Sequence, residues 1–193
     1  MPRTPTEAAA VIRNQSANGP AFGVGECLMQ CHNVYAIPTD GTPSASVAWT
    51  RAKYRHPTSD PTAKIPFGAF IFWTGGSHGF GHVAISTGDG YCWSSDIKRP
   101  GYFDRALVSA PHDQWGLSLA GWTEDVDGVR VITYTPPKPA SPVVPVPVAT
   151  PHLDHAIEDL AAQIAAMKVG PKRAAVRFAR RATLTARRLI RSA

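Results

Sequence analysis

Long apolar runs, cysteine pairs and clustered metal ligands are all missing from this chain of 193 residues. No stretch approaches the roughly 18 consecutive apolar residues of a membrane-spanning helix, which excludes an integral membrane protein. The first 19 residues hold no apolar core, so we expect no Sec signal peptide. Three cysteines are too few for a disulfide framework, and none has structural zinc spacing. We therefore expect chemistry without a metal or other cofactor.

Charge is divided unevenly along the chain. Residues 1–151 carry eleven Lys/Arg and eleven Asp/Glu, whereas residues 152–193 carry nine Lys/Arg and three Asp/Glu, the whole net charge of +6. A basic tail on a neutral domain predicts an anionic partner for the tail, which nucleic acid, a membrane surface or an acidic polymer could supply. The neutral part disfavours broad nucleic-acid contact by the domain itself.

A proline-rich segment marks the boundary between the two parts. Seven prolines lie between Pro136 and Pro151, and they predict an extended, semi-rigid spacer. The β-branched run Arg130–Thr135 just before it predicts a last strand. We expect a folded domain over 1–134, a proline-rich linker over 135–151 and a helical basic tail over 152–193.

Within the domain, helical patterns precede strand patterns. Antiparallel strands are indicated by short aromatic or β-branched runs between glycine turns. Helices first and strands afterwards predict an α+β domain, with N-terminal helices packed on a small antiparallel sheet. The expected helices are Thr6–Asn14, Cys27–Val34 and Ser44–Lys53, and the expected strands are Phe67–Trp73, His82–Ser86 and Tyr91–Ser94.

Two helices are expected in the tail. Apolar residues spaced 4, 3, 4 and 3 form a short heptad seam over 153–167, which predicts possible self-association. A second helix from about Lys172 aligns seven arginines within an arc of roughly 120°. Anionic lipid, nucleic acid and cell-wall polymer remain open as its partner. The seven are Arg173, Arg177, Arg180, Arg181, Arg187, Arg188 and Arg191.

Cys27 is the candidate nucleophile. It follows Gly25 and Glu26, so it lies where a loop enters a helix. A helix N-terminus lowers a thiol pKa and offers backbone N–H groups to an oxyanion, although the carboxylate of Glu26 opposes the first effect. Cys31 and Cys92 are expected to be buried small side chains.

Among seven histidines, His82 is the candidate base for that thiol. The segment GHVAIS places it at the start of a strand, directly after the glycine-rich loop GGSHGFG. A side chain there is held by the sheet and reachable from a cleft. His78 lies within the loop and is held less firmly. From spacing alone, His82 as an ordinary surface residue is the alternative.

The third polar residue should follow on the next strand. A turn at Gly88–Gly90 returns the chain, and alternation puts Ser94 and Asp96 on one face and Ser95 on the other. A carboxylate accepts a hydrogen bond from an imidazole better than a hydroxyl does, so Asp96 is preferred to Ser94. A surface aspartate that caps a turn is the alternative for Asp96.

Taken in order, the segments GECLMQC, PFGAFIFW, GHVAIS and SSD resemble the CHAP and NlpC-type families of cysteine peptidoglycan hydrolases. The later segment WGLSLAGWTEDVDGVRV resembles the end of that domain in lysins and tail-associated hydrolases of actinobacterial phages. The resemblance covers roughly residues 5–134 and implies a papain-like fold. It also implies Cys27 as nucleophile, His82 as base, and Ser94 or Asp96 as the third residue. The upstream side chain that completes the oxyanion hole in relatives has no counterpart here.

The function expected from this resemblance is hydrolysis of an amide bond in bacterial peptidoglycan, by an amidase or an endopeptidase. The enzyme would act on the cell wall from the host cytoplasm during lysis, or be carried in a virion. The alternative is a structural component of a phage virion or tail, whose basic tail docks on a partner, nucleic acid or membrane.

Overall fold

The computed structural model describes residues 1–136, all within the first of the two units of the chain, Met1–Pro137. The rest of the predicted linker, the heptad seam over 153–167 and the arginine helix lie outside the described residues. Within residues 1–136, no helix is both long and apolar enough to cross a membrane.

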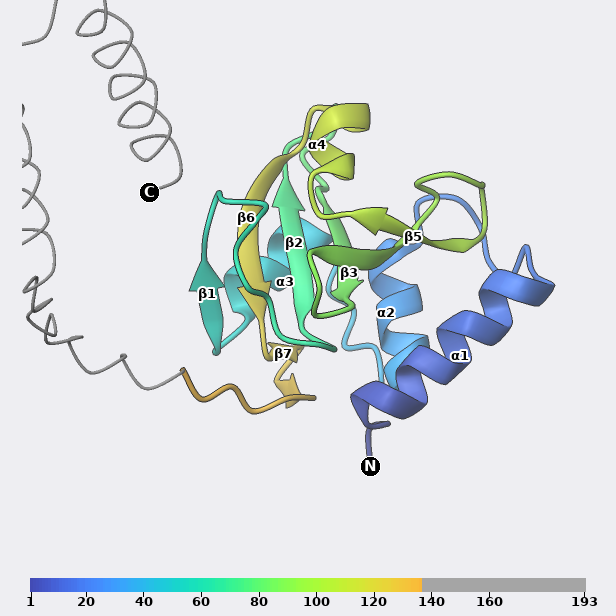
Figure 1. The fold of residues 1–193 in the computed structure, drawn as a ribbon, viewed down its shortest axis with the longest axis horizontal. Helices are drawn as coiled ribbons and strands as arrows, with labels where there is room; N and C mark the ends of the chain where they lie inside the picture. The colour runs from blue at the N-terminus through green and yellow to red at the C-terminus, as the bar shows by residue number, and fades with distance from the viewer. Residues whose placement is uncertain (137–193) are drawn as a thin grey trace, which may run out of the picture. The chain divides into compact units, whose positions relative to one another are not determined.

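The fold is α+β, as expected, and its centre is a six-stranded antiparallel sheet (Figure 1). The strand order is β1-β6-β2-β3-β4-β5, and β7 pairs with β8 in a separate two-stranded sheet. The helices are α1 (Pro5–Asn18), α2 (Cys27–Tyr35), α3 (Ala45–Arg51) and α4 (Ala110–Trp115). The strands are β1 (Arg55–Pro57), β2 (Phe70–Thr74), β3 (His82–Ser86), β4 (Tyr91–Ser95), β5 (Phe103–Leu107), β6 (Ser118–Thr123), β7 (Asp125–Val126) and β8 (Val129–Arg130).

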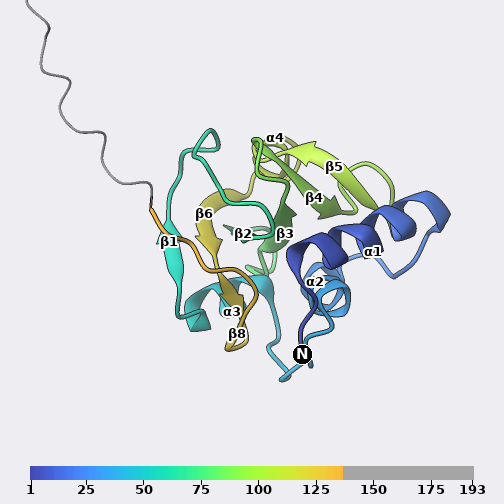
Figure 2. The ribbon, with the colours of Figure 1, turned by 60° about the horizontal axis from the view of Figure 1, so that its bottom comes forward.

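Each face of the sheet has its own apolar core. The views of Figures 1 and 2 place α1, α2 and α3 on one face of the sheet and α4 at the end where β2 finishes. Alternation along β3 sends Val83 and Ile85 into the core beneath the three helices, while Ala84 faces the second core. His82 therefore lies on the face of the second core, opposite the face on which α2 packs.

Local signals explain where the first and third helices begin. Thr4 caps α1 in a capping box with Glu7, and the Ser44 hydroxyl accepts a hydrogen bond from Val47 N at 3.2 Å at the start of α3. In α2, by contrast, the N-cap residue Glu26 makes no side-chain cap hydrogen bond. The start of α2 is therefore held by something other than its own cap.

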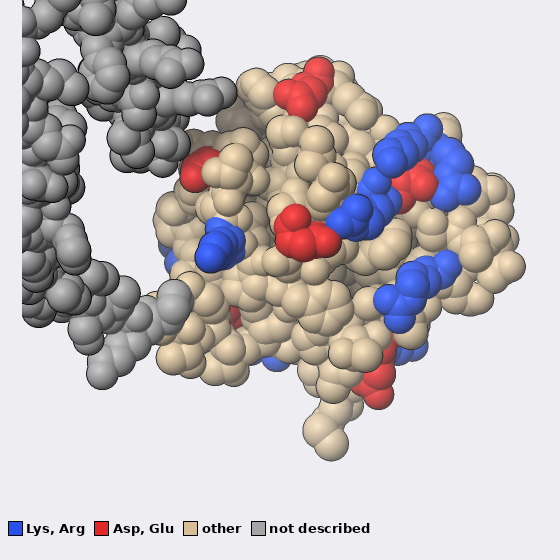
Figure 3. Space-filling model, viewed as in Figure 1, with Lys and Arg blue, Asp and Glu red and all other residues tan. Residues whose placement is uncertain are grey.

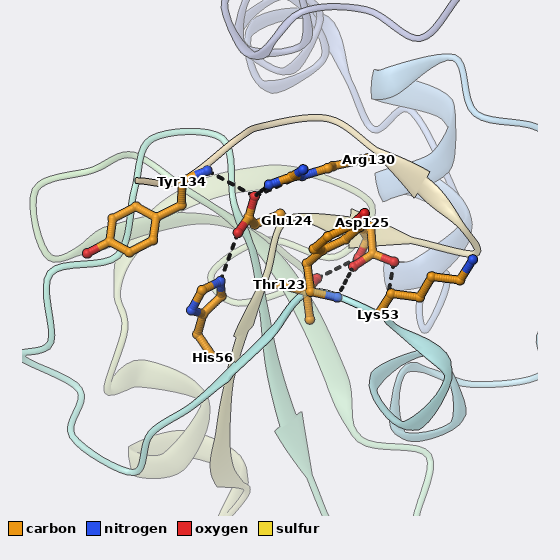
Figure 4. A network of polar contacts seen from close by, with 8 residues as sticks. Lys53, His56, Thr123, Glu124, Asp125, Arg130 and Tyr134 are labelled. Atoms are coloured by element: carbon orange, nitrogen blue, oxygen red, sulfur yellow. Dashed lines mark hydrogen bonds and ion pairs between the residues drawn. The ribbon is translucent and has the colours of Figure 1, made fainter. Parts of the chain in front are cut away.

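The predicted strand over Arg130–Thr135 is wrong beyond Arg130. Residues 131–135 have no strand partner in the described part of the chain, and Ile132 and Tyr134 instead cover the second core. Glu124 fastens this segment, because its carboxylate accepts from Arg130 Nε and from Tyr134 N, each at 2.9 Å (Figure 4). His56 Nε2 lies 3.0 Å from the same carboxylate. The buried carboxylate of Glu124, and not a neighbouring strand, thus holds this segment in place.

The surface of the described domain mixes charges of both signs. Residues 1–136 contain ten Lys/Arg and eleven Asp/Glu, and Figure 3 shows blue and red side chains side by side on the face it presents. Arg105 pairs with Asp89 at 2.7 Å, and Arg99 pairs with Asp104 at 2.6 Å. The domain therefore presents paired charges rather than a broad field of one sign on this face.

Candidate active site

Of the predicted site residues, His82 and Ser94 come together on the face of the sheet that bears the second core, whereas Cys27 packs against the first core beneath the helices. Cys27 is the first residue of α2, His82 is the first residue of β3, and Ser94 lies on the neighbouring strand β4. The backbone N–H of Val83, the residue after His82, faces the Cys27 sulfur. No hydrogen bond joins Cys27 to His82 within residues 1–136, because alternation along β3 turns the imidazole to the other face of the sheet.

The Cys27 thiol is half-buried and is neutral near pH 7. Burial raises its pKa more than the backbone N–H groups of Val83 and Leu28 lower it, and the Asp96 carboxylate raises it further. The sequence-based expectation of a thiol pKa lowered by the helix start is therefore wrong in sign, because desolvation is the larger effect. The N–H groups nevertheless face the sulfur.

The His82 imidazole is buried and hydrogen-bonded to Ser94. Its Nε2 lies 2.9 Å from Ser94 Oγ, and neither residue is more than 5% exposed. Burial lowers the His82 pKa to about 3, so the ring is neutral at pH 7. The second ring nitrogen, Nδ1, makes no hydrogen bond within the described domain. One nitrogen of His82 is thus held by Ser94, and the ring lies on the opposite face of the sheet from the Cys27 thiol.

Two indoles enclose the imidazole, and the sequence offered no signal for either contact. The ring of Trp73, on β2, lies 5.8 Å from that of His82, and the ring of Trp115, at the end of α4, lies edge-on at 5.0 Å. Trp115 is 33 residues from His82 in sequence, so only the packing of α4 on the sheet brings them together. Both rings thus lie against the imidazole.

The glycine before His82 is required by close packing. Gly81 has φ +68°, and a Cβ there would lie 2.3 Å from Trp73 O and 2.6 Å from Ser46 Oγ. A side chain would therefore push the start of β3 away from both neighbours. The glycine-rich loop that marked His82 in the sequence thus has a structural purpose at this position.

The preference for Asp96 over Ser94 as the partner of His82 is wrong in this structure. Asp96 follows the end of β4 with φ +59°, which breaks the alternation that would have kept it on the face of Ser94. Its carboxylate instead accepts hydrogen bonds from Gly25 N at 3.1 Å and Gly101 N at 2.8 Å. Ser94, the second candidate, is the residue that contacts the imidazole.

The remaining sequence candidates lie outside this arrangement. Cys31 and Cys92 are buried, as expected, and burial raises the pKa of the Cys92 thiol to about 12. His78 is exposed in the glycine loop. Among residues 1–136, no group of three or more His, Cys, Asp or Glu side chains could hold a metal ion.

Two further features lie away from the site. His32 on α2 pairs with Asp127 at 2.8 Å, but both side chains are at most 2% exposed and beyond the reach of a substrate. An apolar groove of about 1020 Å³ lies between residues 61–66, the β3–β4 turn and the end of β5. Neither Cys27 nor His82 lines the groove, so its volume has no bearing on their chemistry.

Comparisons of the chain with protein-family models, with curated proteins and with solved structures found no match. A proposal of function therefore depends on the site geometry and on the motifs along the sequence.

Proposed function

We propose that this protein is a cysteine hydrolase of the CHAP or NlpC type, with a papain-like fold, that cleaves an amide bond in bacterial peptidoglycan. The observation that carries the proposal is the Cys27 thiol at the start of α2, where it faces Val83 on β3. His82, the residue before Val83, is held at Nε2 by Ser94 at 2.9 Å. A nucleophile, a base and a group that orients the base are the parts that acyl transfer to a thiol needs. A phage lysin or a virion-associated enzyme fits this activity.

The reaction begins from a neutral pair, because the Cys27 pKa is raised and the His82 pKa is about 3. In the productive tautomer, Nε2–H donates to Ser94 Oγ, and the Ser94 hydroxyl donates to Ser95 O, 3.4 Å away. Nδ1 is then unprotonated, and once the imidazole has turned toward Cys27 it accepts the thiol proton as the sulfur attacks the scissile carbonyl carbon. Proton transfer therefore accompanies attack, and a stable ion pair does not precede it.

The later steps return the site to its starting state. Backbone N–H groups at the start of α2 are suited to the negative oxygen of the tetrahedral intermediate. The imidazolium gives its proton to the leaving amine as the C–N bond breaks, which leaves a thioester on Cys27. Water, deprotonated by His82, then attacks the thioester, and the acid product leaves as the thiol is restored. An amidase and an endopeptidase would both use these steps.

Digestion of purified peptidoglycan, followed by mass spectrometry of the soluble products, tests the proposal and identifies the bond. We expect the wild type to release fragments and Cys27→Ala to release at least about a thousandfold less, since no other side chain supplies the nucleophile. Cys27→Ser should be nearly as inactive, because a serine hydroxyl is not activated here. Cys31→Ala, the same change one turn further along α2, is the control and should retain activity.

If folded wild-type protein releases no fragments, or if Cys27→Ala releases as many as the wild type, the hydrolase proposal is wrong. A structural role in a virion or tail would then be the better account of the chain.

We further propose that residues 152–193, which carry the whole net charge, bind an anionic surface at the site of action. Replacing Arg177, Arg180 and Arg181 with glutamine should weaken binding to anionic liposomes about a hundredfold, at roughly 1 kcal/mol for each charge. Sedimentation with liposomes, cell walls and DNA over a salt series would identify the partner. Glutamine at Arg13, Arg55 and Lys98 removes three charges from the domain and should leave binding unchanged. Equal binding by both triple variants would contradict a targeting role.

A further inference from the structure

The turn between β4 and β5 is joined to the segment that leads into α2. Ala21 N donates to Gly101 O at 2.9 Å, and the Tyr102 hydroxyl donates to Gly19 O. Gly25 N donates to the Asp96 carboxylate at 3.1 Å. Residues 19–25 and 96–102, more than 70 positions apart in sequence, therefore form one hydrogen-bonded unit beside the nucleophile.

Asp96 is the residue at which these connections meet. One carboxylate oxygen accepts from Gly25 N, and the other accepts from Gly101 N within its own turn at 2.8 Å. Its backbone N–H donates to Tyr102 O at 3.1 Å. Both carboxylate oxygens and the amide are thus used to shape the turn and hold it to the α2 segment.

Gly101 provides the close approach that this unit needs. Its φ is +76°, and a Cβ there would lie 2.6 Å from Phe22 O and 2.9 Å from Pro20 Cβ. The two backbones therefore touch directly, with no room for a side chain between them. A methyl group at Gly101 would separate them without changing any charge.

The consequence reaches Cys27 because α2 has no side-chain cap of its own. Glu26, the N-cap residue, makes no cap hydrogen bond, and its neighbour Gly25 is the residue that Asp96 holds. Gly25 is two positions before Cys27, so a displacement of Gly25 moves the start of the helix and the thiol with it.

We propose that Asp96 is a positioning residue for the nucleophile: by tying Gly25 to the β4–β5 turn, its carboxylate fixes the start of α2 and the place of the Cys27 sulfur opposite Val83. The activity part of this inference depends on the proposed hydrolase function. The effect of Asp96 on the thiol itself does not.

The charge of Asp96 gives the inference a second readout. Its negative field raises the Cys27 pKa, so removing the charge should lower that pKa. The other titratable groups around the thiol are Cys31, one turn along α2, the neutral His82 beside Val83, and Glu26, whose carboxylate accepts from Gln30. The carboxylate of Asp96 makes no hydrogen bond to any of these groups within the described domain.

Two variants separate position from charge. Asp96→Asn keeps the side-chain size, and asparagine tolerates the left-handed backbone, but it loses the charge and one of the two acceptor oxygens. Gly101→Ala keeps the charge and disturbs the close approach. Asp89→Asn, at the exposed β3–β4 turn, makes the same change of charge away from the site and is the control.

The measurements are peptidoglycan hydrolysis and the pH dependence of Cys27 alkylation by iodoacetamide, resolved by peptide mapping. We expect Asp96→Asn to lower hydrolysis about ten- to a hundredfold, as a misplaced reacting group does, and to move the alkylation midpoint to lower pH. Gly101→Ala should lower hydrolysis without moving the midpoint to lower pH, because the Asp96 charge is kept. Asp89→Asn should change neither. Cys31 and Cys92 should stay unlabelled in each folded variant.

The outcomes separate this inference from the proposed function. If Asp96→Asn and Gly101→Ala hydrolyse like the wild type while Cys27→Ala is inactive, Asp96 does not position the nucleophile and the hydrolase proposal stands. If Cys27→Ala stays active, the hydrolase proposal falls, and the alkylation midpoint alone decides whether Asp96 acts on the thiol. An unchanged midpoint in folded Asp96→Asn would overturn that action. Should Asp96→Asn not fold, the hydrolysis and labelling of Gly101→Ala decide the positioning role.

Discussion

His82→Ala is expected to abolish hydrolysis as completely as Cys27→Ala, with a loss of about a thousandfold or more. The reason is that the thiol of Cys27 is neutral, and its raised pKa leaves almost no thiolate at pH 7. Attack on the substrate therefore needs a base at the moment of reaction, and the buried His82 is the base that we propose. The double variant should lose no more than either single variant, because the two side chains act as one unit.

Further single variants test the role assigned to each residue. Ser94→Ala leaves Nε2 without its partner and should cost about ten- to a hundredfold, less than removal of the base itself. His78→Ala, an exposed histidine four positions before His82, should have wild-type activity. Turnover of a soluble muropeptide by the folded variants gives the comparison. Independent, additive losses in the double variant would contradict a paired mechanism.

A second large effect is expected on stability in acid. The His82 pKa is about 3 in the folded protein and 6.5 in an unfolded chain, because burial disfavours the charged ring. Between these values the unfolded state binds more protons, so the free energy of unfolding falls as the pH is lowered from 6.5 toward 3. The slope reaches about 1.4 kcal/mol for each pH unit. The contribution is fully present above pH 6.5.

His82→Gln isolates this effect, since glutamine does not titrate and keeps a donor for Ser94. Between pH 7 and 4.5, the wild type should lose about 2.5 kcal/mol more free energy of unfolding than His82→Gln. Urea denaturation at each pH measures the difference. The contributions of the carboxylates cancel, because both proteins carry the same ones. His78→Gln, which changes an exposed histidine, should follow the wild type. Parallel curves for the wild type and His82→Gln would show that the imidazole is solvated.

Local patterns in the sequence were enough to predict several elements and two site positions. Thr6–Asn14, Cys27–Val34 and His82–Ser86 were each expected within a few residues of α1, α2 and β3. Helix starts and hairpin strands depend on neighbouring residues, through glycine turns and apolar periodicity. The same local signals placed Cys27 at a helix start and His82 at a strand start.

Tertiary structure decided what those side chains meet. Whether Ser94 or Asp96 reaches His82 depended on the left-handed φ of Asp96, which joins its carboxylate to Gly25, 71 positions away. Residues 131–135 were predicted as a strand from their β-branched content, yet the buried Glu124 holds them over the second core. Periodicity specifies which way a segment folds, but not which distant segment packs against it.

The protonation states of Cys27 and His82 could likewise not be predicted from the sequence. A helix start lowers a thiol pKa and a lone histidine titrates near 6.5, and both effects can be stated from residue type and position. Burial instead raises the pKa of the Cys27 thiol and lowers the pKa of His82 to about 3. Desolvation depends on the atoms that surround a group in space. Here these include the ring of Trp73, which the pairing of β2 with β3 brings to His82, and the ring of Trp115, which α4 brings there.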